Sequence, residues 1–119
     1  MANKTIKWFK VADSKAAIAW QSNNMALAEA GGKTITLIKT GNEIAACAHK
    51  CPHAGGVLAD GFVDALGNIV CPLHRYKFSL KNGRNVSVEG YYLKLYAIEE
   101  REAGVFVGFE ESNWLSIFV

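Results

Sequence analysis

Two short segments of the sequence each place one cysteine beside one histidine. The first segment reads CPH over residues 51–53, the second reads CPLH over residues 71–74, and seventeen residues separate them. The candidate ligands are Cys51, His53, Cys71 and His74. A thiolate and a neutral imidazole both bind iron and zinc, which are metals of borderline softness. The pairing therefore predicts a metal site held between two loops.

The division of ligands between the two segments favours one kind of metal site. A structural zinc finger normally pairs cysteine with cysteine and histidine with histidine at close spacing. Here each segment supplies one of each. If the segments face each other, the two cysteines can bind one metal ion and the two histidines a second. That is the ligand division of a Rieske centre, in which two histidines replace two cysteines on one iron of a 2Fe–2S cluster. A structural zinc site stays open as the alternative.

The sequence resembles the Rieske family at these segments. The family signature is C-x-H, a spacer and C-x-x-H, and the flanking CPHAGG and CPLHRYKFSL also look like the family's two cluster-binding loops. The resemblance implies a Rieske-type 2Fe–2S cluster held by loops 51–56 and 71–76. It places Cys51 and Cys71 on the buried iron. It places His53 and His74 on the outer iron, near solvent.

The sequence also departs from part of the family. High-potential members carry two further cysteines that link the loops by a disulfide, and the corresponding places here are Gly56 and Leu73. We expect neither that disulfide nor the membrane anchor of those proteins. The chain is closer to the soluble Rieske ferredoxins and to the Rieske-type small subunit of nitrite reductase. Arg75 stands where many of these ferredoxins have glycine, and we expect it to shape the partner surface.

Composition and charge restrict the remaining possibilities. The 119 residues, half of them hydrophobic and a fifth charged, predict one globular domain spanning 1–119. A net charge of only +2, without a basic run, gives no reason to expect nucleic acid or a membrane surface as partner. Residues 1–10 lack the apolar stretch of a signal peptide. Three cysteines, two of them beside histidines, suit a reducing compartment. We therefore expect a cytoplasmic protein.

The pattern of the chain predicts an all-β fold. Eleven glycines against two prolines indicate many tight turns. Asp13 and Ser14 can cap a helical turn over residues 15–18, and Asn82–Gly83 is a hairpin signal. With the resemblance, we expect a Rieske-like antiparallel sandwich or barrel of about eight to ten strands. The main strand candidates are 6–11, 25–29, 33–39, 43–47, 69–70, 76–80, 91–100 and 105–109.

Four other features have two interpretations each. Cys47 is expected to be a small apolar strand residue and His49 an exposed loop histidine, rather than further ligands. Tyr76 is expected to be a core aromatic residue, although it could donate a hydrogen bond near the cluster. The apolar tail 114–119 is either an extra strand or a docking or oligomer contact. Gly55 and Gly56 either form an ordinary turn or give the backbone room beside the cluster.

The resemblance implies an electron-transfer protein. We expect a ferredoxin that carries one electron between a flavin reductase and a terminal oxygenase or reductase, and that has no catalytic activity alone. A second hypothesis is the small subunit of an assimilatory nitrite reductase complex. A third, from another class, is a zinc-stabilised interaction module. If the tail 114–119 is an oligomer contact, copies of the chain associate through it as a homo-oligomer.

Overall fold

The computed structural model describes residues 4–52, 55–86 and 91–112 of the chain, with nine strands and two short 3-10 turns among them. This confirms the predicted all-β class and the predicted number of strands. The elements in chain order are β1 (Lys4–Ala12), η1 (Lys15–Ala17), β2 (Met25–Ala30), β3 (Lys33–Thr40), β4 (Glu43–Ala48), η2 (Leu58–Asp60), β5 (Phe62–Val63), β6 (Asn68–Val70), β7 (Lys77–Ser79), β8 (Leu95–Arg101) and β9 (Gly104–Ser112). None of the elements in the described part of the chain is a helix long and apolar enough to cross a membrane.

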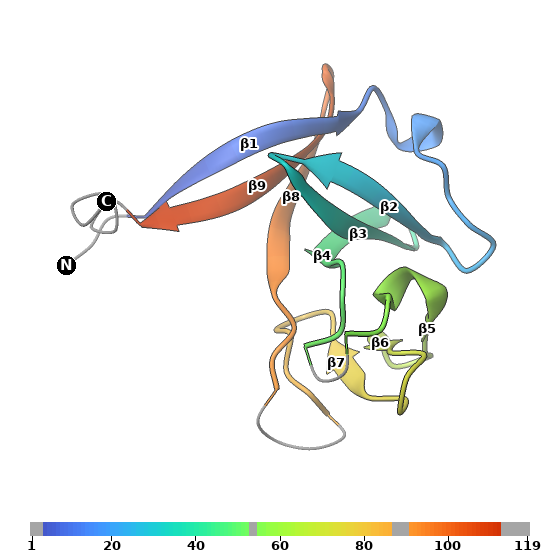
Figure 1. Cartoon of the computed structure of the whole chain (residues 1–119). Coiled ribbons are helices and arrows are strands. Elements are labelled where there is room, and N and C mark those ends of the chain that lie inside the picture. The colour runs from blue at the N-terminus through green and yellow to red at the C-terminus, as the bar shows by residue number, and fades with distance from the viewer. Residues whose placement is uncertain (1–3, 53–54, 87–90, 113–119) are drawn as a thin grey trace.

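The strands form two antiparallel sheets (Figure 1). The larger sheet has six strands in the order β1-β9-β8-β4-β3-β2. The smaller sheet has three strands in the order β5-β6-β7 and lies at the end of β4 that leads out of the large sheet. The chain leaves the large sheet after β4, builds the small sheet, and returns at β8. Both candidate ligand segments therefore belong to the excursion that builds the small sheet.

Strand β3 separates two hydrophobic cores. Alternate side chains of a strand point to opposite faces. Ile35 and Leu37 belong to a core inside the large sheet with Val105 and Val107. Ile38 belongs to a second core that extends under the small sheet. Both faces of β3 are therefore covered, which is why its apolar residues do not follow a simple inside–outside alternation.

The second core contains both candidate cysteines. Its buried members are Met25, Ile38, Cys47, Cys51, Leu58, Ala59, Ile69, Cys71, Phe78 and Leu93. Because these residues come from the large sheet, the η2 turn and the small sheet, the core joins the two sheets. The cysteines are thus fixed by the packing that holds the small sheet on the large one.

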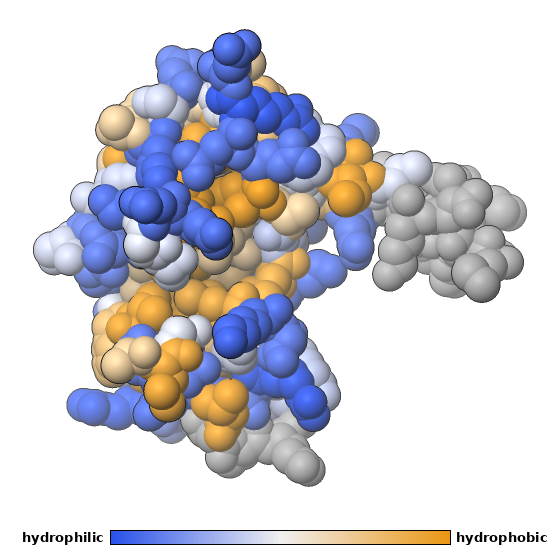
Figure 2. Space-filling view, turned by 180° about the vertical axis from the view of Figure 1, so that it is seen from behind, coloured by the Kyte–Doolittle hydropathy of each residue, from blue (hydrophilic) through white to orange (hydrophobic). Residues whose placement is uncertain are grey.

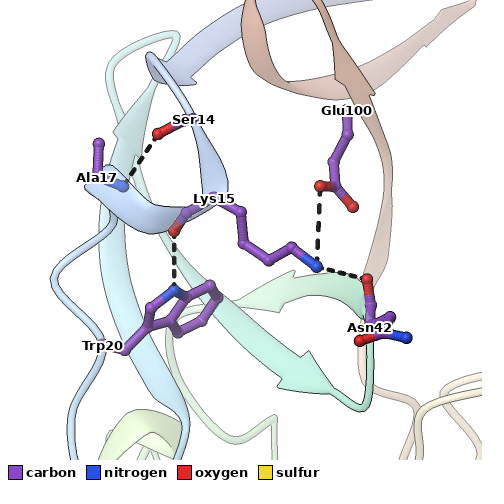
Figure 3. Close-up of polar contacts among 6 residues, drawn as sticks. All are labelled: Ser14, Lys15, Ala17, Trp20, Asn42 and Glu100. Carbon is purple, nitrogen blue, oxygen red and sulfur yellow. Dashed lines mark hydrogen bonds and ion pairs between the residues drawn. The ribbon is translucent and has the colours of Figure 1, made fainter.

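The connection between β1 and β2 is held by a lysine. The Ser14 hydroxyl oxygen accepts the Ala17 N–H, as the predicted cap does, and the Lys15 carbonyl accepts the Trp20 indole N–H (Figure 3). The Lys15 ammonium group donates to the carbonyl of Asn42 and lies 3.9 Å from a carboxylate oxygen of Glu100. This one side chain links the η1 turn to the β3–β4 turn and to β8.

One predicted strand is wrong in its first half. The pattern predicts a strand over residues 91–100, but β8 begins only at Leu95. The Leu93 N–H donates to the Gly83 carbonyl at 2.7 Å, whereas the Lys94 carbonyl accepts the Ala48 N–H at 3.0 Å. The backbone groups of the segment before β8 therefore form hydrogen bonds with two different partners, as the chain crosses from the small sheet to the large one. A continuous ladder along one neighbour is not possible there.

Candidate metal centre

The two predicted loops have the same backbone closure. In the first, the Cys51 N–H donates to the Gly56 carbonyl at 2.8 Å, and in the second the Cys71 N–H donates to the Tyr76 carbonyl at 2.8 Å. Each loop is thus a closed turn of six residues that begins at its cysteine. The first loop follows β4 and the second lies between β6 and β7. Because the same backbone hydrogen bond closes both loops, the two cysteines occupy equivalent positions, each at the start of its loop.

Both cysteines are buried and lie against each other. Cys51 is 3% exposed and Cys71 is fully buried. The two thiols are free and lie close together in the same core. Burial raises the pKa of the Cys71 thiol; the Leu73 N–H, which donates to its sulfur, opposes this, and the neighbouring Cys51 adds to it. A metal cation bound between two adjacent buried thiols would convert them to thiolate ligands.

The second loop turns outward at His74. His74 and Arg75 both have left-handed backbone conformations, with φ of +60° and +55°, and both are exposed. Left-handed backbone is costly for residues other than glycine, and consecutive examples mark a tightly determined turn. The turn sets a histidine at the surface while the cysteine three residues earlier stays in the core. That difference in exposure is what the predicted outer and inner ligands require.

The structure brings together part of the predicted ligand set. Cys51 and Cys71 are in contact, and His74 lies at the end of the same loop as Cys71. His53 falls outside the described residues. Within residues 4–52, 55–86 and 91–112, no group of three or more His, Cys, Asp or Glu side chains is close enough together to hold a metal ion. The four-ligand set therefore stays a prediction.

The two positions where other members of the family carry extra cysteines lie side by side here. A Cβ atom placed on Gly56 would be 3.0 Å from Leu73 Cγ and 3.1 Å from Cys71 Sγ. Gly56 is thus needed for space beside the cysteine. Gly55 has open space but a φ of +73°, so it is needed for the turn itself. Each glycine fits one of the two interpretations considered for the pair.

Cys47, Tyr76 and His49 were expected to lie outside the ligand set. Cys47 is fully buried in β4, and burial raises the pKa of its thiol to about 12, so it acts as an apolar core residue. Tyr76 packs on the same core and its ring lies 6.1 Å from that of Tyr91. The prediction of an exposed His49 is wrong, because it is half-buried and its Nδ1 is buried with no hydrogen-bond partner among the described residues. The η2 turn lies against it, because the Leu58 N–H donates to the His49 carbonyl at 3.1 Å.

Comparisons with known proteins identify relatives of the same kind. A 3-phenylpropionate/cinnamic acid dioxygenase ferredoxin subunit from Shigella flexneri is 25% identical over 80 residues, which are 66% of this chain and 76% of that protein. The ferredoxin of carbazole 1,9a-dioxygenase from Nocardioides aromaticivorans has the same fold, with a TM-score of 0.70 and 19% identity over 85% of this chain and 96% of that one. A Mycobacterium tuberculosis protein assigned as an NADH-dependent nitrite reductase small subunit gives a TM-score of 0.74 and 16% identity, over 88% of this chain and 96% of that one.

The donor set and the fold point to the same cofactor. Two buried thiols in contact, with a histidine on the adjoining surface turn, fit the inner and outer sides of a Rieske-type 2Fe–2S cluster. When bound, such a cluster supplies a centre that takes up and releases one electron. The Rieske [2Fe-2S] domain matches residues 7–94, which include both loops. This chain is therefore an electron-transfer protein that belongs to the Rieske [2Fe-2S] domain family.

Proposed function

We propose that the chain acts as a ferredoxin between a flavin-containing reductase and a terminal oxygenase or reductase. The observation that carries this proposal is the pair of buried, touching thiols of Cys51 and Cys71 directly beneath an exposed loop. The ferredoxin subunits among its relatives support it. An electron carrier needs a redox centre that is shielded from water yet close to the surface where a partner docks, and this arrangement supplies both.

We further propose that the protein side of the centre divides into two pairs of ligands. Cys51 and Cys71 would hold the inner iron in the core. His53 and His74 would hold the outer iron and keep one ring edge toward solvent. The closed turn that begins at each cysteine fixes its backbone, so each cysteine is held in place before any metal binds. We propose no catalysis by the chain alone, and a cytoplasmic location.

A second candidate is the small subunit of a nitrite reductase complex. The similarity to the Mycobacterium tuberculosis structure, which extends over 96% of that chain, supports this candidate. The two candidates differ in what the chain is bound to. Co-purification of a large chain that contains sirohaem and flavin would favour the subunit. A stable free chain that accepts electrons from a reductase would favour the ferredoxin.

The apolar tail 114–119 lies outside the described residues. We propose that it makes a contact between copies of the chain. Size-exclusion chromatography of the full chain and of a chain ending at residue 113 tests this contact. The expected result is a larger species only for the full chain, and equal elution of the two forms would contradict it.

The cofactor and the ligands are tested on anaerobically purified protein. We expect about two irons and two acid-labile sulfides per chain and a Rieske-type electron paramagnetic resonance signal after reduction. His74→Ala and His53→Cys should each change or abolish that signal. His49→Ala is the matched control, because it removes the histidine that the signature does not include, and it should leave the signal intact. One zinc per chain with almost no iron would instead establish the zinc-stabilised module.

A further inference from the structure

Charge is unevenly distributed between the two parts of the molecule. From His49 to Lys94, the part that carries the loops and the small sheet, there are six Lys and Arg residues against three Asp and Glu, one of which, Glu89, lies outside the described residues. The rest of the chain has seven against eight. The small net charge of the whole chain therefore hides a positive end and a slightly negative one.

Two of the basic side chains lie directly beside the predicted ligands. Lys50 directly precedes Cys51, and Arg75 directly follows His74. Both are exposed. We call Lys50 and Arg75 the basic rim.

The salt bridges found among the described residues involve basic side chains outside the basic rim. In the large-sheet part, Lys10 lies 2.7 Å from Asp13, Lys15 lies 3.9 Å from Glu100, and Arg101 lies 2.8 Å from Glu99. Near the small sheet, Lys77 lies 3.9 Å from Asp64. With six basic residues against three acidic ones, this part of the chain carries a formal excess of three positive charges.

Exposed apolar and aromatic side chains lie in or beside the second loop. Leu73 is 46% exposed, Tyr91 is 40% exposed and Tyr92 is 63% exposed. Tyr91 lies next to the second loop through its ring contact with Tyr76 at 6.1 Å. In Figure 2, hydrophobic residues also reach the surface of the lower part of the molecule, among hydrophilic ones. Apolar side chains inside a charged rim are the usual composition of a protein docking surface.

The backbone at Arg75 gives an independent reason to assign its side chain a role. Its φ of +55° is in the region that favours glycine, yet the residue is arginine. Glycine would relieve the strain but remove the charge. A strained position that keeps a long, exposed cation is explained if the cation is used at the surface.

We propose that the surface around the two loops docks a redox protein whose own surface is acidic. This inference rests on the proposed electron-transfer function and adds the sign of the charge that selects the partner. Opposite charge at the site of electron transfer raises the rate of encounter, and salt reduces the effect. Arg75 is the residue with the largest expected contribution, because it adjoins the predicted outer ligand.

Stopped-flow oxidation of the dithionite-reduced protein tests the sign of the field without an identified partner. The two oxidants are ferricyanide, which is a trianion, and tris(phenanthroline)cobalt(III), which is a trication. We expect the ferricyanide rate constant to fall as ionic strength rises and the cobalt rate constant to increase. Rates that do not depend on salt, or that depend on it with the opposite signs, would overturn the proposal.

Variants then locate the effect. Arg75→Gly should lower the ferricyanide rate constant at low salt by roughly two- to four-fold, whereas Arg75→Lys, which keeps the charge, should not. Lys33→Gln removes an exposed charge from the start of β3 and is the control expected to have little effect. Thermal unfolding of Arg75→Gly should be unchanged or shifted upward, which separates loss of charge from loss of structure. Equal rate losses for Arg75→Gly and Lys33→Gln would contradict a role of the basic rim.

Different results would refute the electron-transfer function and the acidic partner. A chain without iron that reacts with neither oxidant would refute the proposed function itself. A chain with its cluster whose rate constants with both oxidants do not depend on salt would leave electron transfer standing and refute only the acidic partner.

Discussion

Among single residues, Gly56 and Leu73 show how closely the two loops pack against each other. The resemblance to the Rieske family places the disulfide of its high-potential members at these two positions, and here a Cβ on Gly56 would already be 3.0 Å from Leu73 Cγ. The leucine side chain occupies the space instead, and it remains 46% exposed. The contact between the two loops is thus made by packing, and the Gly56 position has no spare volume.

Gly56→Ala should therefore disturb the cysteines. The added methyl group would lie 3.1 Å from Cys71 Sγ, closer than carbon and sulfur normally approach, so either the loop or the sulfur must move. We expect a loss of about 1–3 kcal/mol in the free energy of unfolding and a lower iron content after purification. Chemical denaturation and iron analysis measure these two effects.

Gly55→Ala provides the contrast for that experiment. Gly55 has a φ of +73° and nothing within 4 Å of the added Cβ. The substitution should cost roughly 1–2 kcal/mol through backbone strain, with iron content close to that of the parent. If Gly55→Ala lost as much iron as Gly56→Ala, the close contact with Cys71 would not be the cause.

At the scale of elements, the β5–β6 hairpin is held by one carboxylate. The Asp64 carboxylate accepts the N–H groups of Leu66 and Asn68, each at 3.0 Å, and lies 3.9 Å from the Lys77 ammonium group on β7. The Asn68 backbone N–H is the largest cause of a lowered pKa for Asp64, followed by the Asn68 side chain, the Leu66 N–H and the charge of Lys77. The small sheet is therefore stabilised through an ionised side chain.

This hairpin should make stability depend on pH. Because the pKa of Asp64 is lower in the folded state than its ordinary value of 3.8, the ionised form stabilises the fold above that value. The contribution is lost as the pH falls below 3.8 and through the folded-state pKa. Urea denaturation at a series of pH values should show a smaller acid-induced loss for Asp64→Asn than for the parent. Asn68→Ala, which removes one donor to the carboxylate, should show an intermediate loss; an unchanged pH profile in Asp64→Asn would refute the role of this residue.

In the molecule as a whole, each of the two hydrophobic cores stabilises a different part of the structure. The core of the large sheet is formed by β2, β3, β4 and β9 residues such as Ile35, Leu37 and Val107. The core that contains Cys51 and Cys71 supports the small sheet and the loops. A metal bound to these cysteines would add stability to the second core, because binding to the folded state alone stabilises that state.

Removal of the metal should therefore loosen one part of the molecule. In the apoprotein, prepared by acid treatment and chelation, we expect amides of the small sheet, such as Ile69 and Phe78, to exchange hydrogen faster. Amides of Leu37 and Val107 in the large sheet should keep most of their protection. Hydrogen exchange followed by mass spectrometry makes the comparison. Equal loss of protection in both sheets would show that the two cores form a single cooperative unit.

Some of this architecture follows from local sequence. The turns after Ala30 and Thr40, the Ser14 cap and the alternation of short strands are set by neighbouring residues, so the predicted strands over 33–39, 43–47 and 105–109 match β3, β4 and β9. The ligand spacing is also local, since each loop brings one cysteine and one histidine. These features need no knowledge of distant contacts.

Other features were decided by tertiary structure. Whether residues 91–94 join a strand depends on Gly83 and Ala48, which are distant in sequence and take their backbone groups. That His49 is half-buried depends on the η2 turn, whose Leu58 N–H donates to the His49 carbonyl. The contact between Cys51 and Cys71 exists only because β4 and β6 bring two closed turns together. By itself, the sequence determined the residue types of the metal site and the all-β class. Only the tertiary structure decided that Cys51 and Cys71 meet in one core and that residues 91–94 stay outside β8, because these depend on contacts between residues far apart in the chain.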